Sequence, residues 1–312
     1  MLATRRIFGL YCPTGEYVRQ RSLRLRERGM ICESQQSLWP SRPCWRERLL
    51  MQAAQGSPTR SECTVEIDTT GGPGFGFEQY RVHDFLLPKE VILTFDDGPW
   101  PETTRAVLDA LDAHCTKATF FIIGKHALWH PDILKDVAAR GHTIGSHTWS
   151  HANLRKMKNV KAKEEIEKGL SAIRIALDSA PAPFFRFPYL QDPKELIDYL
   201  GSRNIAIFSH DIDSFDFKFR KPDALVKSVM SKLGKKGKGI VLMHDFQKVT
   251  AKALPDLLDQ LAAEGYKVVH MTPKDPVSTL QEYDQLAQVE VKGPVGSGRP
   301  TSSVVRTIST GQ

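Results

Sequence analysis

Apolar runs with the character of β-strands alternate with helical patterns along the chain from about residue 91 onward. The apolar runs cover residues 91–97, 119–124, 142–147, 184–188, 205–213, 239–245 and 266–271. Helical periodicity between them covers residues 101–114, 131–140, 160–178, 192–203, 222–233 and 251–264. Strands that alternate with helices are typical of a parallel sheet. The pattern therefore predicts an α/β fold, and its regularity favours a distorted (β/α)7 barrel over a doubly wound sheet.

Two adjacent carboxylates stand at the end of the first of these strands. The sequence TFDDGP (94–99) closes the apolar run with Asp96 and Asp97, and Gly98 and Pro99 then turn the chain. Burying two carboxylates is costly unless cations or hydrogen-bond donors accompany them. A bound metal ion together with a water molecule would satisfy both side chains.

Candidate partners for such an ion follow a later strand. His147 and His151 have the i, i+4 spacing that predicts one face of a helical turn. One carboxylate and two histidines, with coordination positions left open for water, are typical of a catalytic metal site. Arg186, Asp216 and His244 also fall at or just past strand ends, and a (β/α) barrel gathers these ends at one face. Asp213 could belong to this site or cap its own strand.

Five short motifs in a fixed order make a resemblance to a known family specific. They are TFDDGP (94–99), HTWSH (147–151), RFPY (186–189), DSFDF (213–217) and LMHD (242–245). In this order they resemble the polysaccharide deacetylase family, which has the NodB homology domain and forms carbohydrate esterase family 4. The resemblance covers residues 88–272. The fourth motif usually ends in Asp-Trp, but here it ends in Asp216-Phe217, a change that bears on substrate preference more than on the chemistry.

The resemblance implies a barrel of the glycoside hydrolase/deacetylase type and a metal-dependent hydrolase. Its reaction would remove N-acetyl, or alternatively O-acetyl, groups from a carbohydrate polymer such as chitin oligomers, peptidoglycan or exopolysaccharide. The expected cofactor is one divalent ion, with Zn²⁺ placed ahead of Co²⁺. The implied metal ligands are Asp97, His147 and His151. The implied catalytic residues are Asp96 as base, His244 as acid, Arg186 orienting Asp96, Asp216 paired with His244, and the backbone N–H of Tyr189 at the oxyanion.

Two other functions are compatible with such a fold. One is a hydrolase that acts on a small non-sugar amide, and the other is an inactive carbohydrate-binding protein. Loss of the Asp-Asp pair or of the final histidine would mark either of them. This chain keeps Asp96, Asp97 and His244, so the sequence favours the deacetylase.

The flanks of the barrel sequence differ from it in charge and composition. Of the 312 residues, the first 60 hold eleven arginines and four glutamates, which account for the whole net charge of +7. The remainder is neutral, so we expect no nucleic-acid partner. We predict that residues 1–60 form a basic, disordered extension, that residues 61–87 form a lead-in loop, and that residues 285–312 form a disordered tail.

The sequence gives little information on whether the protein is exported or forms oligomers. No run reaches the roughly 18 apolar residues of a membrane span. The N-terminus also lacks the apolar core of about 7–15 residues that marks a signal peptide. The family implies a secreted or periplasmic protein, since its polymeric substrates lie outside the cytoplasm. The five cysteines show no Cys-x-x-Cys spacing, and nothing in the sequence indicates an oligomeric state.

Overall fold

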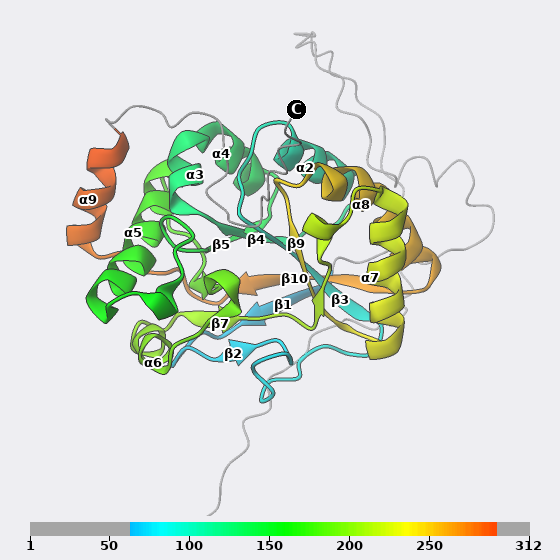
Figure 1. The fold of residues 1–312 in the computed structure, drawn as a ribbon, viewed down its shortest axis with the longest axis horizontal. Helices are drawn as coiled ribbons and strands as arrows, with labels where there is room; N and C mark the ends of the chain where they lie inside the picture. Colours follow the sequence, from blue (N-terminus) through cyan, green and yellow to red (C-terminus); the bar gives the residue numbers. More distant parts are fainter. Residues whose placement is uncertain (1–62, 292–312) are drawn as a thin grey trace, which may run out of the picture. The chain divides into compact units, whose positions relative to one another are not determined.

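Residues 63–291 are described by the structure, a computed structural model, and they form a barrel of parallel strands surrounded by helices (Figure 1). The strands are β1 (Cys63–Ile67), β2 (Gly74–Phe75), β3 (Glu90–Asp96), β4 (Thr119–Ile122), β5 (Thr143–Ser146), β6 (Phe184–Phe185), β7 (Ala206–Phe208), β8 (Ile212–Asp213), β9 (Gly239–His244) and β10 (Lys267–Pro273). Parallel pairing runs from β3 through β4, β5 and β6 to β7, and from β8 through β9 back to β3. The predicted distorted α/β barrel is confirmed, while the predicted extension of residues 1–60 lies outside the described residues.

The alternation of side chains along each strand decides which residues face the barrel interior. On β3, Val91, Leu93 and Phe95 pack outward in the core shared with the helices, whereas Ile92 packs inward. The inward apolar cluster also takes residues from other strands, among them Phe121, Phe184, Ala206, Phe208 and Ile240. These side chains fill the barrel interior, and Phe121 lies at the level of Asp96 in the strand register. The same alternation carries Asp96 to the inner side at the end of its strand.

The run at residues 205–213, predicted as one strand, is divided into β7 and β8. The backbone N–H of Asp211 bonds to the carbonyl of Ile240 at 2.9 Å, and the Asp211 carboxylate accepts the N–H groups of Ile240 (2.7 Å) and Phe77 (2.8 Å). The single-strand prediction is therefore wrong. A polar side chain that bonds to backbone on two sides interrupts the strand, and β7 and β8 do not pair with each other.

Three further strands pair along the edges of this barrel. β1 pairs with β10, β10 pairs with the first two residues of β3, and β2 pairs with β7. The prediction of a lead-in loop at residues 61–87 is therefore wrong where β1 and β2 form. Both strands satisfy backbone groups of neighbouring edge strands, a long-range effect that local composition does not encode.

The helices lie outside the strands, and they match the predicted helical patterns except for two. They are α2 (Thr103–Ala113), α3 (Gly124–Trp129), α4 (Pro131–Ala139), α5 (Asn159–Leu177), α6 (Lys194–Ser202), α7 (Pro222–Lys236), α8 (Lys248–Ala263) and α9 (Gln281–Val291). Figure 1 shows α7 beside α8, and α9 against α5. The sequence did not predict α3 or α9, and α9 corrects the expected disordered tail as far as residue 291. No helix within residues 63–291 has both the length and the hydropathy that crossing a membrane requires.

Buried histidines with lowered pKa values predict that acid destabilises the fold, and His142, directly before β5, gives a test. Burial, with smaller contributions from Lys117 and His270, lowers the pKa of His142 to about 3. The unfolded chain therefore takes up this proton first as the pH falls below about 6.5, and stability is lost from that pH downward. We expect His142→Asn to reduce the loss of unfolding free energy between pH 7 and 5 by on the order of 2 kcal/mol.

The asparagine keeps an acceptor for the backbone N–H of Ala118, which the ring Nδ1 accepts at 3.2 Å. Urea unfolding at a series of pH values measures the effect, with the exposed His83→Asn as control. Parallel stability curves for the His142→Asn variant and the parent protein would contradict the assignment.

Candidate active site

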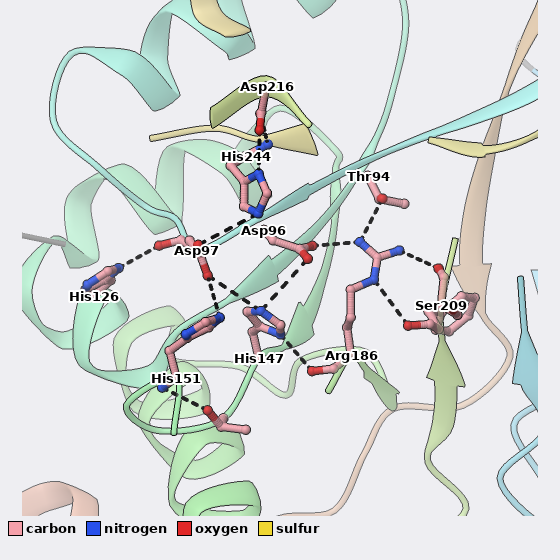
Figure 2. Close-up of polar contacts among 12 residues, drawn as sticks. Thr94, Asp96, Asp97, His126, His147, His151, Arg186, Ser209, Asp216 and His244 are labelled. Carbon is pink, nitrogen blue, oxygen red and sulfur yellow. Dashed lines mark hydrogen bonds and ion pairs between the residues drawn. The ribbon is translucent and has the colours of Figure 1, made fainter. Parts of the chain in front are cut away.

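A buried ion pair fixes the first of the two carboxylates (Figure 2). Arg186 follows β6 and is fully buried, and its Nη1 donates to Asp96 Oδ1 at 2.7 Å and to Thr94 Oγ1 at 2.8 Å. Its Nε and Nη2 donate to the carbonyls of Phe208 (3.2 Å) and Ser209 (2.9 Å). The guanidinium is thus held by two strands besides its own, and it orients the Asp96 carboxylate. The predicted pairing of Arg186 with Asp96 is present.

The second carboxylate, Asp97, meets the two predicted histidines. The Nε2 atoms of His147 and His151 each lie 3.5 Å from Asp97 Oδ1. All three side chains are buried. The Nδ1 of His147 bonds to the backbone carbonyl of Arg186 at 2.7 Å, which directs its Nε2 toward Asp97.

The helical turn predicted for His147 and His151 is absent. Thr148 and His151 have φ values of 69° and 58°, so the segment after β5 is a tight loop. The hydroxyl oxygen of Thr148 accepts the backbone N–H of His151 at 3.0 Å. Gly169 of α5 packs so closely beneath the loop that an added Cβ would lie 2.6 Å from the carbonyl carbon of Thr148. The two imidazoles converge because of this loop and not because of helical spacing.

The three side chains fit a metal ion. Their ligand atoms lie within 4.8 Å of one another. The two separations of 3.5 Å from Asp97 Oδ1 exceed an ordinary hydrogen bond. Ligands with bond lengths of about 2.0–2.2 Å in a tetrahedral site lie about 3.3–3.5 Å apart, which matches these separations. The hydrogen bond from His147 to a backbone carbonyl is typical of a metal-binding histidine.

His244, at the end of β9, faces the same space. Its Nε2 lies 4.0 Å from Asp97 Oδ2, and its Nδ1 bonds to Asp216 Oδ1 at 2.7 Å. Asp216 Oδ2 accepts the backbone N–H of His244 and the hydroxyl of Thr250, each at 2.7 Å. Burial by itself lowers the pKa of His244, but the neighbouring carboxylates, Asp216 foremost, outweigh it and raise the pKa to about 10. The ring is therefore a proton donor at neutral pH.

Two aromatic side chains stand on the exposed rim of this site. Tyr189 is 44% exposed, and its ring centroid lies 4.8 Å from that of His151. Phe217, 37% exposed, has its centroid 6.0 Å from that of His244. Tyr189 has a φ of 59°, a left-handed conformation inside the short helix η2 (Pro188–Leu190). The structure thus brings all eight predicted site residues together, whereas Asp213 caps its strand by accepting the N–H of Phe215 at 2.8 Å.

Sequence reasoning missed residues that hold the carboxylate loop in place. The Nδ1 of the buried His126 in α3 bonds to the backbone carbonyl of Asp97 at 2.6 Å. On the other side, Thr104 accepts the N–H of Trp100 (2.7 Å) and donates to Asp245 Oδ2 (2.6 Å). Burial raises the pKa of Asp245 to about 7. Asp245 is part of the LMHD motif, so the sequence could have identified it as a site residue, whereas His126 belongs to no motif.

Comparison with known proteins places this site in a family. The sequence profile described as polysaccharide deacetylase matches residues 86–206. A peptidoglycan-N-acetylglucosamine deacetylase of Bacillus cereus is 34% identical over 221 residues, which are 68% of this chain and 79% of that protein. The chain belongs to the polysaccharide deacetylase family. The resemblance expected from the five motifs is thereby confirmed.

Two further relatives define how far the similarity extends. The peptidoglycan-N-acetylglucosamine deacetylase PgdA of Listeria monocytogenes is 35% identical over 181 residues, which are 58% of this chain but only 38% of that protein. The solved structure of the Bdellovibrio bacteriovorus peptidoglycan deacetylase Bd3279 matches with a TM-score of 0.63 at 32% identity. The match covers 74% of this chain and 71% of the Bd3279 chain. The barrel of this chain is therefore a polysaccharide deacetylase barrel.

The bond from His126 to Asp97 predicts an effect on metal affinity. We expect His126→Leu to weaken metal binding about tenfold, because the peptide that follows Asp97 loses the donor that fixes it. His126→Asn, whose amide can place an N–H near the position of Nδ1, should recover part of the loss. Competition with a chromophoric chelator measures the dissociation constant.

His130→Leu is the matched control. The rings of His130 and His126 both meet Trp100 edge-on with centroids 5.3 Å apart, but only His126 bonds to the Asp97 carbonyl. An equal loss of affinity in both leucine variants would show that packing on Trp100, and not the hydrogen bond, supports the site.

Proposed function

We propose that the chain is a metal-dependent deacetylase that hydrolyses N-acetyl groups, or alternatively O-acetyl groups, on a carbohydrate polymer. One observation carries the proposal. A candidate base (Asp96), a candidate acid (His244) and a set of metal ligands surround one space at the C-terminal ends of the strands. The family membership and the peptidoglycan and chitooligosaccharide deacetylases among the relatives support the same reaction.

Asp97, His147 and His151 would hold one divalent ion. A mixed nitrogen and oxygen ligand set with open positions favours Zn²⁺, with Co²⁺ as the alternative. When bound, such an ion would polarise the acetyl carbonyl and make water more acidic. The chain's own contribution is to hold the three ligand atoms together, through the His147 bond to Arg186 and the loop at Thr148.

Asp96 is the proposed general base. Its Oδ1 is engaged by Arg186 at 2.7 Å, while its Oδ2 lies 3.9 Å from His147 Nε2 and so faces the space between the ligands. An ionised carboxylate in that position can take the proton of the attacking water. Arg186 favours the ionised form of Asp96 because the two opposite charges lie in contact.

His244 is the proposed general acid, and Tyr189 supplies the proposed oxyanion donor. The protonated ring of His244 is held by Asp216 on the Nδ1 side, so its Nε2 can give a proton to the leaving amine. The backbone N–H of Tyr189, on the opposite rim, would donate to the oxyanion. The rings of Tyr189 and Phe217 would line the entrance where a sugar ring packs on aromatic faces.

The two alternative functions receive less support. An inactive carbohydrate-binding protein does not need the fully buried Arg186 to orient Asp96, nor Asp216 to charge His244, and burying such groups is costly. A hydrolase of a small amide needs an enclosing pocket. The exposed rings of Tyr189 and Phe217 instead leave an open rim that suits a polymer.

Replacing Asp96 and Asp97 separately by asparagine tests the function. Asp96→Asn should retain the metal but lower the rate of acetate release by about 10²–10⁴-fold, because the amide cannot accept the proton of water. Asp97→Asn should instead lower metal content, since a neutral amide oxygen is a poorer ligand for a divalent cation. Acetate release from acetylated chitin and peptidoglycan oligomers and metal content per chain are the two measurements. A parent protein that releases no acetate with metal added, or the reverse metal pattern in the two variants, would overturn the proposal.

The bond between Asp216 and His244 predicts the pH dependence. Because the acid must be protonated, activity falls as the pH rises through the pKa of His244, which the neighbouring carboxylates raise to about 10. Asp216→Asn removes the foremost of these charges and should move the alkaline limb of kcat/KM to lower pH by at least about one unit. The pH profile from 6 to 10 measures the shift.

Thr250→Val is the control for this prediction. It removes one hydrogen bond to Asp216 but leaves the negative charge, so its alkaline limb should stay near that of the parent protein. An unshifted limb in Asp216→Asn would mean that His244 is not the group that titrates.

A further inference from the structure

The rim of the site around η3 (Asp216–Lys218) continues outward from His244 as a path of exposed rings. Phe217 stands next to His244, and the ring centroid of Phe215 lies 6.1 Å from that of Phe217. Phe215 and Phe217 are 36% and 37% exposed, and Phe215 has a φ of 51°. A polymer bound at His244 would extend over these two rings.

Two ammonium groups share the ring of Phe215. Lys218 Nζ lies 4.0 Å from the centroid of Phe215 and 5.6 Å from that of Phe217. Lys232 Nζ, from α7, lies 4.5 Å from the centroid of Phe215. Each contact is an attractive cation–π interaction. Because both cations gather on one ring, their mutual repulsion opposes this gain.

The carboxylates near these two ammonium groups compensate them only in part. Within residues 63–291, neither Lys218 nor Lys232 forms an ion pair, although Lys232 Nζ donates to the backbone carbonyl of Asp213 at 2.7 Å. The Asp213 carboxylate accepts the backbone N–H of Phe215 instead. Exposed lysines elsewhere do pair, as Lys194 does with Asp198 at 2.7 Å. The rim defined by Lys218, Lys232 and Phe215 therefore carries two positive charges against one nearby carboxylate, Asp213, which attracts Lys232 without forming an ion pair with it.

Building on the proposed deacetylase function, we propose that this cationic rim binds a carboxylate carried by the glycan near the sugar that is deacetylated. The substrate class is then an anionic acetylated glycan in preference to a neutral one. Phe217 would pack on a sugar ring, while Lys218 and Lys232 meet the negative group farther along the chain. The carboxylate can be that of a lactyl ether on alternate sugars or that of a uronic acid, since the ammonium groups recognise the charge that both share.

Binding of matched oligomers separates these possibilities. The three ligands have equal length: a neutral N-acetylglucosamine oligomer, one with lactyl ethers on alternate sugars, and one with alternate uronic acids. We expect the metal-loaded parent protein to bind at least one anionic oligomer about fivefold more tightly than the neutral one, a ratio that two exposed ion pairs can supply. The anionic arm with the lower Kd identifies the source. Raising the salt concentration should reduce the ratio because exposed charges are screened.

Lysine variants assign the preference to the rim. Lys218→Met and Lys232→Met should each lower the ratio of neutral to anionic Kd by about two- to fivefold, and the double variant should abolish the preference. Lys221→Met, which removes an exposed lysine directly before α7, is the control and should keep the ratio. A parent protein with equal Kd for neutral and anionic oligomers, or a ratio that the double variant retains, would overturn the inference.

Acetate release is measured on the same oligomers so that the two proposals fail separately. Absence of acetate from every oligomer would defeat the deacetylase assignment, yet the Kd ratio would still decide whether the rim selects anionic glycans. Acetate release at equal kcat/KM from all three oligomers, together with equal Kd values, would leave the deacetylase assignment standing and defeat the inference about the rim.

Discussion

Burial of the two adjacent carboxylates Asp96 and Asp97 at the mouth of the barrel is the constraint on which the rest of the site depends. A buried charge persists only where an opposite charge or hydrogen-bond donors accompany it. Asp96 obtains Arg186, and the same guanidinium bonds to the carbonyls of Phe208 and Ser209 at the end of β7. The Arg186 side chain therefore neutralises Asp96. It also links β3, β6 and β7 by hydrogen bonds, next to the interruption between β7 and β8. Support of the fold and orientation of the candidate base come from the same contacts.

The two neighbouring carboxylates serve different partners because the strand ends between them. Strand alternation directs Asp96 inward, and it would direct Asp97 to the opposite side. Asp97 has a φ of 73°, a left-handed conformation that aspartate adopts at modest cost, and this turns its carboxylate toward His147 and His151. The bonds from His126 to the Asp97 carbonyl and from the N–H of Ile123 to the Gly98 carbonyl hold this conformation. Contacts from the segment after β4 thus separate a candidate base from a candidate metal ligand within two residues.

The sequence predicts those features that depend on local pattern. Strand runs and helical periodicity predicted the barrel. Motifs at strand ends predicted eight candidate site residues, and the structure brings these side chains together because positions at the C-terminal ends of parallel strands converge by geometry. The helical turn assigned to His147 and His151 was wrong, since their spacing fits a helix but packing against Gly169 and the conformation of Thr148 produce a loop. The short α3 shows little periodicity, and α9 is held by the long-range pairs Lys168–Glu290 and Arg174–Asp284. The role of His126 could not be predicted either, because its partner is a backbone carbonyl 29 residues away in the sequence.

Phe217 replaces the Trp that is usual at this position of the motif. This change shows that the exposed rim of the site tolerates substitutions that its buried part does not. Arg186 and Asp216 are fully buried within hydrogen-bond networks, and Asp97 is fully buried beside His147 and His151, so a change to any of them leaves an uncompensated polar group. Phe217 and Lys218 are exposed, and each of their contacts contributes only a fraction of a kcal/mol to about 1 kcal/mol. Phe217 keeps an aromatic face but has no N–H to donate, and the ammonium group of Lys218 lies 5.6 Å from its ring centroid. Weak exposed interactions can change between relatives without loss of the fold, so substrate charge can be selected at the rim while the buried arrangement for hydrolysis stays the same.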